Sequence, residues 1–126
     1  MNREQRDAIA AAIRDAEDGT TSRIAVRVVP DKAVDAFGRA KREFERAGLH
    51  QHEAENAALI LVAPRARRFA ILGDRALHER VGDDFWNDLV KKSQPYFARG
   101  QLFEGILYAV DRIGEAVHEH FPESAE

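Results

Sequence analysis

Apolar residues recur at helical spacing at the start of the chain, where they mark an amphipathic helix. Asn2 and Gln5 fit the two positions of a capping box at its beginning, and Gly19 fits a left-handed stop at its end. The next run, Ile24–Val29, is rich in β-branched residues and largely alternates in polarity. This pattern predicts a strand, which Pro30 ends.

A second helix is expected to follow, with Asp31 as its N-cap and Gly48 as its stop. Helical spacing predicts one buried stripe along it. The residues of that stripe are Val34, Phe37, Ala40, Phe44 and Ala47.

The segment Ala57–Ala63 is apolar at every position, which is typical of a strand covered on both faces. The next apolar run, Arg68–Leu72, follows after a connection so short that the two strands must form an antiparallel hairpin. Together with the preceding strand and helix, the central strand completes a right-handed βαβ unit. The predicted sheet consists of Ile24–Val29, Ala58–Ala63 and Phe69–Gly73.

Beyond Gly73 the pattern becomes helical again. Ala76–Val81 is predicted as a short helix, and Asp83 or Asp84 as the cap of a longer one that Pro95 breaks or restarts. The longer helix carries the apolar residues Phe85, Trp86, Leu89 and Val90. Core packing is expected for the aromatic residues around Pro95, whereas exposure of Tyr96 or Phe97 would indicate a groove for a partner. These aromatic residues are Phe85, Trp86, Tyr96 and Phe97.

After Gly100 a terminal helix is expected to run to Phe121 and Pro122. Its buried stripe would hold Leu102, Ile106, Val110, Ile113 and Val117. We therefore expect one domain over residues 1–122 and a frayed tail at 123–126. The predicted fold class is α/β, a three-layer sandwich in which helices flank both faces of a short mixed sheet.

Composition narrows the possible functions. The chain has 126 residues, of which 33% are charged, and a formal net charge of −3, which gives no overall attraction to nucleic acid or to anionic membranes. It has no cysteine, so thiolate metal sites, disulfides and cysteine nucleophiles are excluded. No signal peptide or membrane-spanning run is visible, so we expect a cytoplasmic protein without membrane insertion.

The ordered pieces of the sequence resemble the TPM domain family, which is named for a thylakoid acid phosphatase-like protein, a photosystem II repair protein and a modulator of a nematode receptor. The resemblance covers almost the whole chain. The pieces that carry it are Ile13-x-x-Ala16-Glu17-x-x-Thr20, Asn56-x-x-Leu59-Ile60-Leu61-Val62-Ala63, Arg68-Phe69-Ala70-Ile71-Leu72-Gly73-Asp74, Phe97-x-x-Gly100-x-x-x-x-Gly105, Ile113-Gly114 and His120-Phe121-Pro122.

This resemblance implies a short, soluble member of the family with helices around a mixed sheet. It also implies calcium binding as in some members, and either phosphatase activity or a role in assembly. The chain departs from the family pattern at Ser22-Arg23-Ile24, where an acidic residue usually opens the first strand, and at Asn56-Ala57, where Asn-Gly is usual. Both departures weaken the transfer of a metal site.

Carboxylates follow the third predicted strand and open the helix beyond it, at the end of the sheet where α/β folds tend to bind ligands. Calcium prefers several such oxygen ligands. The candidate metal ligands are Asp74, Asp83, Asp84, Asn56 and Glu104. The alternative is that Asp83 or Asp84 caps a helix and Asp74 fixes a turn.

Two other clusters have candidate chemistry. His52 and Glu53 begin a motif close to that of zinc peptidases, but Asn56 replaces the second histidine, so solvated histidines are expected. Arg65, Arg67 and Arg68 crowd the predicted hairpin. They suit a phosphate or an acidic partner, or they simply keep a sheet edge soluble.

The usual signatures of phosphatases are absent from the sequence. We therefore expect a non-catalytic TPM-type module that binds a divalent cation, most plausibly calcium, and acts in protein interaction or assembly. The alternatives are a weak metal-dependent acid phosphatase and a module that binds no ion. The protein partner is left open.

Overall fold

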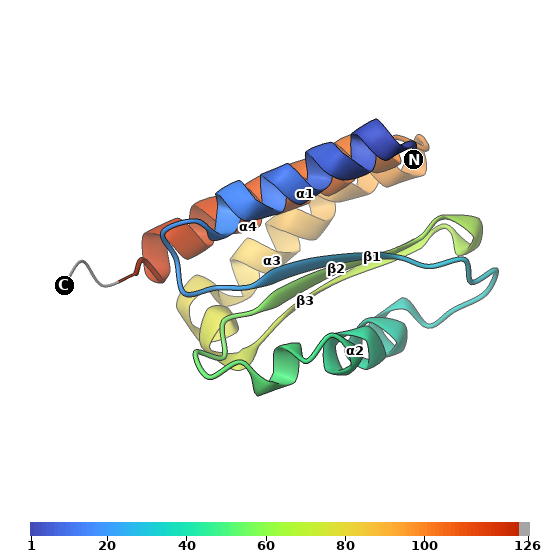
Figure 1. The fold of residues 1–126 in the computed structure, drawn as a ribbon. Helices are drawn as coiled ribbons and strands as arrows, with labels where there is room; N and C mark the ends of the chain where they lie inside the picture. Colours follow the sequence, from blue (N-terminus) through green and yellow to red (C-terminus); the bar gives the residue numbers. More distant parts are fainter. Residues whose placement is uncertain (124–126) are drawn as a thin grey trace.

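The computed structural model describes residues 1–123, which fold into three layers (Figure 1). Glu123 lies within this part, and its backbone N–H donates to the Gly19 carbonyl at 2.8 Å. The rest of the predicted tail, 124–126, lies outside the described residues. The elements are α1 (Arg3–Glu17), β1 (Ile24–Val28), α2 (Ala36–Arg46), the 3-10 turn η1 (Leu49–Gln51), β2 (Ala58–Ala63), the 3-10 turn η2 (Pro64–Ala66), β3 (Arg68–Gly73), α3 (Arg75–Ala98) and α4 (Leu102–His120).

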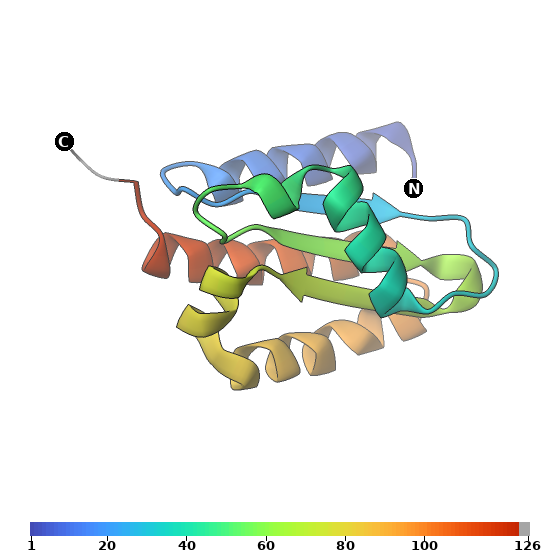
Figure 2. The same ribbon diagram turned by 90° about the horizontal axis from the view of Figure 1, so that it is seen from below.

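The sheet has the strand order β1-β2-β3. β1 runs parallel to β2, with Ile24 opposite Ala58, and β3 runs antiparallel to β2. Every residue of β2 is buried, because helices cover both faces of the sheet (Figure 2). The predicted fold class, a mixed sheet between two helical layers, is confirmed.

The alternation of β2 divides the core into two halves. Ile60 and Val62 pack with α1, α3 and α4 in the larger half, whereas Leu59 and Leu61 pack with α2 in the smaller half. Figure 2 shows α2 alone on one face and the three longer helices on the other. Burial of the whole central strand stabilises the fold, because apolar area is removed from water on both of its sides.

The outer edge of β1 is partly closed by side chains. Because Arg23 and Val29 bond to β2 at the two ends of this strand, the polar backbone groups of Ile24 and Val26 face outward. The Ile24 N–H donates to Glu17 Oε2 at 2.6 Å, and the Val26 carbonyl accepts from the Arg27 guanidinium at 2.9 Å. Such side chains discourage the pairing of another strand.

The second helix begins later than the sequence predicted. Its first residue is Ala36 and its N-cap is Asp35, so the assignment of Asp31 as the cap was wrong. The Asp31 carboxylate instead forms an ion pair with Arg39, in which Oδ2 lies 3.3 Å from Nε. Phe37, placed on the buried stripe, is 51% exposed, because the buried face of the shorter helix is formed by residues such as Ala40 and Phe44.

Gly82 is non-helical (φ 78°, ψ 169°) and kinks α3 into two helical segments, which correspond to the two helices predicted after Gly73. Pro95 lies inside this helix rather than breaking it. It is near the C-terminal end, where the loss of one backbone donor is tolerated because only one more turn follows. Val90, one of the apolar residues of this helix, is 41% exposed. None of the helices within residues 1–123 is long and apolar enough to cross a membrane.

Candidate functional site

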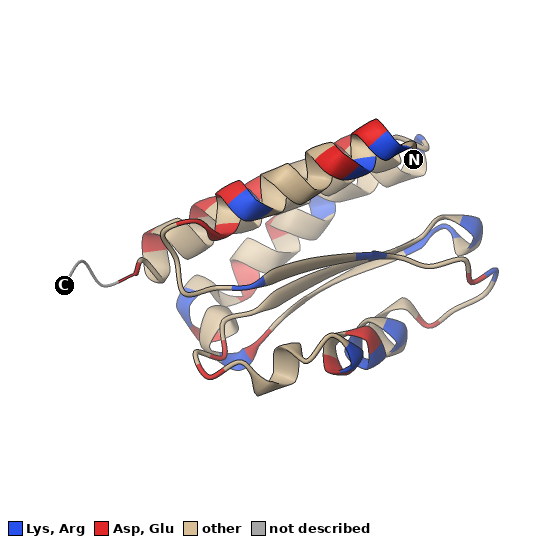
Figure 3. Ribbon diagram, in the orientation of Figure 1, with Lys and Arg blue, Asp and Glu red and all other residues tan. Residues whose placement is uncertain are grey.

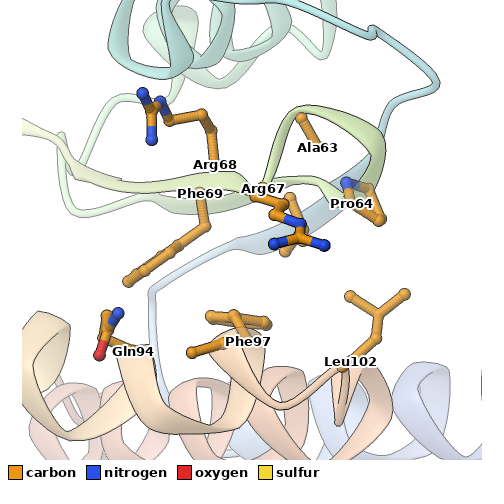
Figure 4. Close-up of a pocket in the computed structure, with 11 residues that line it drawn as sticks. Ala63, Pro64, Arg67, Arg68, Phe69, Gln94, Phe97 and Leu102 are labelled. Carbon is orange, nitrogen blue, oxygen red and sulfur yellow. The ribbon is translucent and has the colours of Figure 1, made fainter.

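A pocket of about 690 Å³ lies between the β2–β3 hairpin and the junction of α3 with α4. Figure 4 shows the two walls, with the hairpin on one side and the helical junction on the other. The residues of this hairpin pocket are Val62, Ala63, Pro64, Arg67, Arg68, Phe69, Gln94, Phe97, Ala98, Gly100 and Leu102. Its volume is in the range of ligand-binding clefts.

The hairpin wall is shaped by the tight turn after β2. Pro64 starts the 3-10 turn η2, and Arg67 ends it in the left-handed region with φ 54°. A non-glycine residue pays a conformational cost there. In this conformation the Arg67 side chain points into the pocket toward Phe97 and Leu102, whereas Arg68 points away from them (Figure 4).

The helical wall depends on two glycines. Gly100 adopts φ 73° after α3 and allows the chain to turn into α4. Gly105 leaves room for the Phe97 ring, because a Cβ at this position would lie 2.8 Å from Phe97 Cε1. Phe97 also contacts Phe69 across the pocket, with ring centroids 4.6 Å apart. The floor is therefore an aromatic pair held between the two walls.

The charge of the pocket is positive. Among residues 1–123, the charged residues that line it are Arg67 and Arg68, and both are exposed. Neither takes part in an ion pair with another residue of the described part of the chain. Figure 3 shows the basic colour of this hairpin. Arg65, the third arginine of the predicted cluster, does not line the pocket.

The predicted metal ligands lie elsewhere. Asp74 caps α3, and its Oδ1 accepts from the Arg75 N–H at 2.8 Å. Asp83 Oδ1 lies 3.2 Å from His78 Nε2 and its side chain is 82% exposed, and Asp84 is also exposed. Asp74, for which the alternative was a role in a turn, is thus the N-cap of α3.

Asn56 is fully buried at the start of the central strand region. Its side-chain Nδ2 donates to Thr21 Oγ1 at 2.8 Å, and its main-chain carbonyl accepts from Ser22 Oγ at 2.7 Å. These bonds tie the segment before β1 to the segment before β2. The Asn56 Oδ1 atom has no hydrogen-bond partner among residues 1–123.

Asn56 and Asp74 lie at the same end of the sheet, because the Asp74 N–H donates to the Ala57 carbonyl at 2.9 Å. Arg75 continues this link through an ion pair with Glu55 at 2.7 Å. The hydrogen bond to Glu55, and then the one to Glu79, raise the pKa of the Arg75 guanidinium.

Glu104 lies at the opposite end, in the first turn of α4. That helix starts beside the β2–β3 hairpin, whereas α3 starts at the far end of β3 (Figure 2). The structure therefore does not bring Glu104 together with Asp74. Within the described residues, no group of three or more histidine, aspartate or glutamate side chains is placed to hold a metal ion.

Two of the histidines contact main-chain carbonyls of other segments. His52 Nε2 lies 2.7 Å from the Thr21 carbonyl, and His118 Nε2 lies 3.3 Å from the Asp15 carbonyl. Each contact joins a side chain to a neighbouring backbone segment. They explain these two residues without a zinc ion.

Sequence reasoning identified the arginines of the hairpin but missed the pocket. The missing information was the contact of the hairpin with Gln94, Phe97 and Leu102, which lie far along the chain. The signals that pointed there were the basic turn and the aromatic residues around Pro95. The hairpin and these aromatic residues come together only in the folded chain, and no local sequence pattern indicates that contact.

The family model described as the TPM domain matches residues 1–116. The solved structure of the BA42 protein from the psychrophilic bacterium Bizionia argentinensis is similar to this chain, with 31% identity and a TM-score of 0.88 over 99% of this chain and 86% of that one. No curated protein matches the chain.

Two more solved structures share the fold at low identity. The N-terminal domain of a protein from P. gingivalis has 14% identity and a TM-score of 0.82, over 100% of this chain and 83% of that one. The N-terminal domain of the cg2496 protein from Corynebacterium glutamicum has 16% identity and a TM-score of 0.73, over 98% of this chain and 78% of that one.

Proposed function

Because this chain belongs to the TPM domain family, we propose that it is a non-catalytic binding domain that recognises an acidic protein partner through the hairpin pocket. The observation that carries this proposal is the position of Arg67, which points over an aromatic floor. A guanidinium beside apolar rings suits a carboxylate attached to an apolar segment.

The chemistry of the lining favours binding. Its side chains are apolar apart from two arginines and the Gln94 amide. A hydrolytic site requires a nucleophile or an activated water, with a base to accept a proton. The residues of the hairpin pocket supply positive charge and apolar area instead.

Charge complementarity specifies the partner. The whole chain carries a formal charge of −3, yet the described residues that line the pocket include two cationic side chains and no carboxylate. An acidic segment is therefore attracted to this place and repelled by much of the remaining surface. Its binding should weaken as ionic strength rises, because both arginines are exposed and therefore screened by salt.

The test uses a fluorescently labelled peptide of alternating glutamate and leucine, titrated with the protein. Arg67→Glu should weaken binding about tenfold or more, as expected for the loss of one charge-assisted contact and the addition of a repulsive charge. Arg42→Glu makes the same charge change on α2, on the other face of the sheet, and should leave the affinity unchanged. Equal affinities of the two variants would refute the proposed site.

A divalent cation is the second candidate ligand. The observation that favours it is the buried, unpartnered Oδ1 of Asn56 at the end of the sheet where Asp74 lies. Amide and carboxylate oxygens are ligands that calcium accepts. We place Asp74 and Asn56 in this proposed site and leave Glu104 out of it. Calorimetric titration of chelator-treated protein with calcium, magnesium and zinc tests the proposal.

The alternative activity is a weak, metal-dependent acid phosphatase. A phosphomonoester assay on the same protein, with and without calcium, decides between the two functions. Metal-dependent turnover that is lost in Asp74→Asn would favour the phosphatase. Calcium binding without turnover supports the binding domain.

A further inference from the structure

The outer edge of β3 is open, unlike that of β1. The Asp74 N–H donates to the Ala57 carbonyl, so the backbone groups of Ala70 and Leu72 face β2 while those of Phe69 and Ile71 face outward. Among residues 1–123, no hydrogen bond joins the backbone of Phe69 or Ile71 to a residue on that side. An unpaired edge is a template for another strand.

The two ends of this edge differ in what surrounds them. At the Gly73 end the indole of Trp86 lies against the backbone. At the other end, Arg68 and Phe69 line the hairpin pocket together with Gln94. The open backbone groups thus occur beside a concave space that has a cation and an aromatic floor.

We infer that the hairpin pocket receives an extended segment of an acidic protein, which adds to the sheet along β3 beginning at Phe69. This inference rests on the function proposed above and adds the conformation of the partner. In strand addition, main-chain hydrogen bonds hold the segment, and pockets for alternate side chains select its sequence.

The pocket provides each kind of contact. The Phe69 backbone offers the N–H and C=O that pair with the segment, and the Gln94 amide lies close by on α3. An apolar side chain of the segment rests on Phe97 and Leu102. A carboxylate two residues along lies on the same face of the segment and reaches Arg67, which points into the same space (Figure 4).

The experiment compares hexapeptides in which leucine and glutamate lie two positions apart, with threonine at the positions between them, so that leucine and glutamate share one face of the strand. The peptides are acetylated and amidated at their ends and N-methylated at one peptide bond at a time. N-methylation removes a donor and blocks strand pairing without changing the charge. Methylation at each alternate amide should weaken binding about three- to tenfold, because it removes one main-chain hydrogen bond to β3. Methylation of the amides between them should have little effect.

Hydrogen exchange of the protein gives an independent readout. Binding of the unmethylated peptide should slow exchange of the Phe69 amide. The amide of Val26, on the outer edge of β1, serves as the control and should exchange at its original rate. Slowing at Val26 instead of Phe69 would place the segment on the wrong edge and overturn the inference.

The outcomes separate the two proposals. Tight binding that depends on Arg67 but is insensitive to methylation at every position would leave the acidic partner in place and refute strand addition. No binding of the unmethylated peptide would refute both. An alternating methylation pattern together with protection of Phe69 supports both.

Discussion

Gly73 lies against the indole ring of Trp86 so closely that a Cβ on Gly73 would be 2.4 Å from Trp86 Cζ2. This contact fixes α3 against the end of β3, just before the helix begins at Arg75. Phe85 packs edge-on to the same indole, with ring centroids 5.1 Å apart. The absence of a side chain at Gly73 is therefore a packing requirement.

Gly73→Ala should destabilise the protein by roughly 1–3 kcal/mol, because the added methyl group cannot fit without displacing the indole. Urea denaturation measures the free energy of unfolding. Adding Trp86→Phe to this variant should recover part of the loss, since the smaller ring leaves space, and the double-mutant cycle should show a favourable coupling. Additive effects of the two substitutions would contradict the contact.

Leu61→Ala should cost about 2–5 kcal/mol, because it leaves a cavity beside α2 in a strand that is buried on both faces. Val90→Ala provides the matched control. Val90 is 41% exposed on α3, so this variant should stay within about 0.5 kcal/mol of the wild type. Thermal and urea unfolding of both variants check the difference.

Calcium should raise the melting temperature of the wild-type protein by linkage if Asp74 and Asn56 bind it. Asp74→Asn should remove most of that gain and leave the calcium-free protein equally stable, because asparagine caps a helix as well as aspartate does. Glu104→Gln is the control, since α4 starts at the opposite end of the sheet, and it should keep the full gain. An unchanged melting curve of the wild type in calcium would end the cation proposal.

Arg67→Gly should separate stability from binding. Arg67 has φ 54°, which glycine adopts without a steric cost, whereas alanine does not. The glycine variant should be more stable than Arg67→Ala by about 1 kcal/mol, while both should lose affinity for the acidic peptide. If the two variants unfold at the same midpoint, the left-handed conformation of this turn is not under strain.

The sheet could be predicted from the sequence because its signals are local. The wholly apolar run of β2 requires cover on both faces, and the short turn after it permits only a hairpin. The start of α2 could not be predicted in the same way. Asp31 is a good capping residue, but its carboxylate pairs with Arg39 instead, and that competition depends on the folded chain.

The candidate site shows the same limit. Arg67 was recognised from its place in a basic turn. The direction of its side chain depends on a left-handed backbone conformation that the sequence pattern does not indicate. Its neighbours Phe97 and Leu102 come from another part of the chain. Glu104 was grouped with Asp74 because calcium takes several oxygen ligands, and only the tertiary arrangement separates the two residues.

The side chains that occupy the outer edge of β1 also limit self-assembly. Glu17 and Arg27 already bond to two of the backbone groups there, so another copy of the chain meets less obstruction at β3. Two copies that paired through β3 would each have that edge occupied by the other copy. A third copy would meet the partly blocked edge of β1, so edge-to-edge association should favour a pair over a fibre.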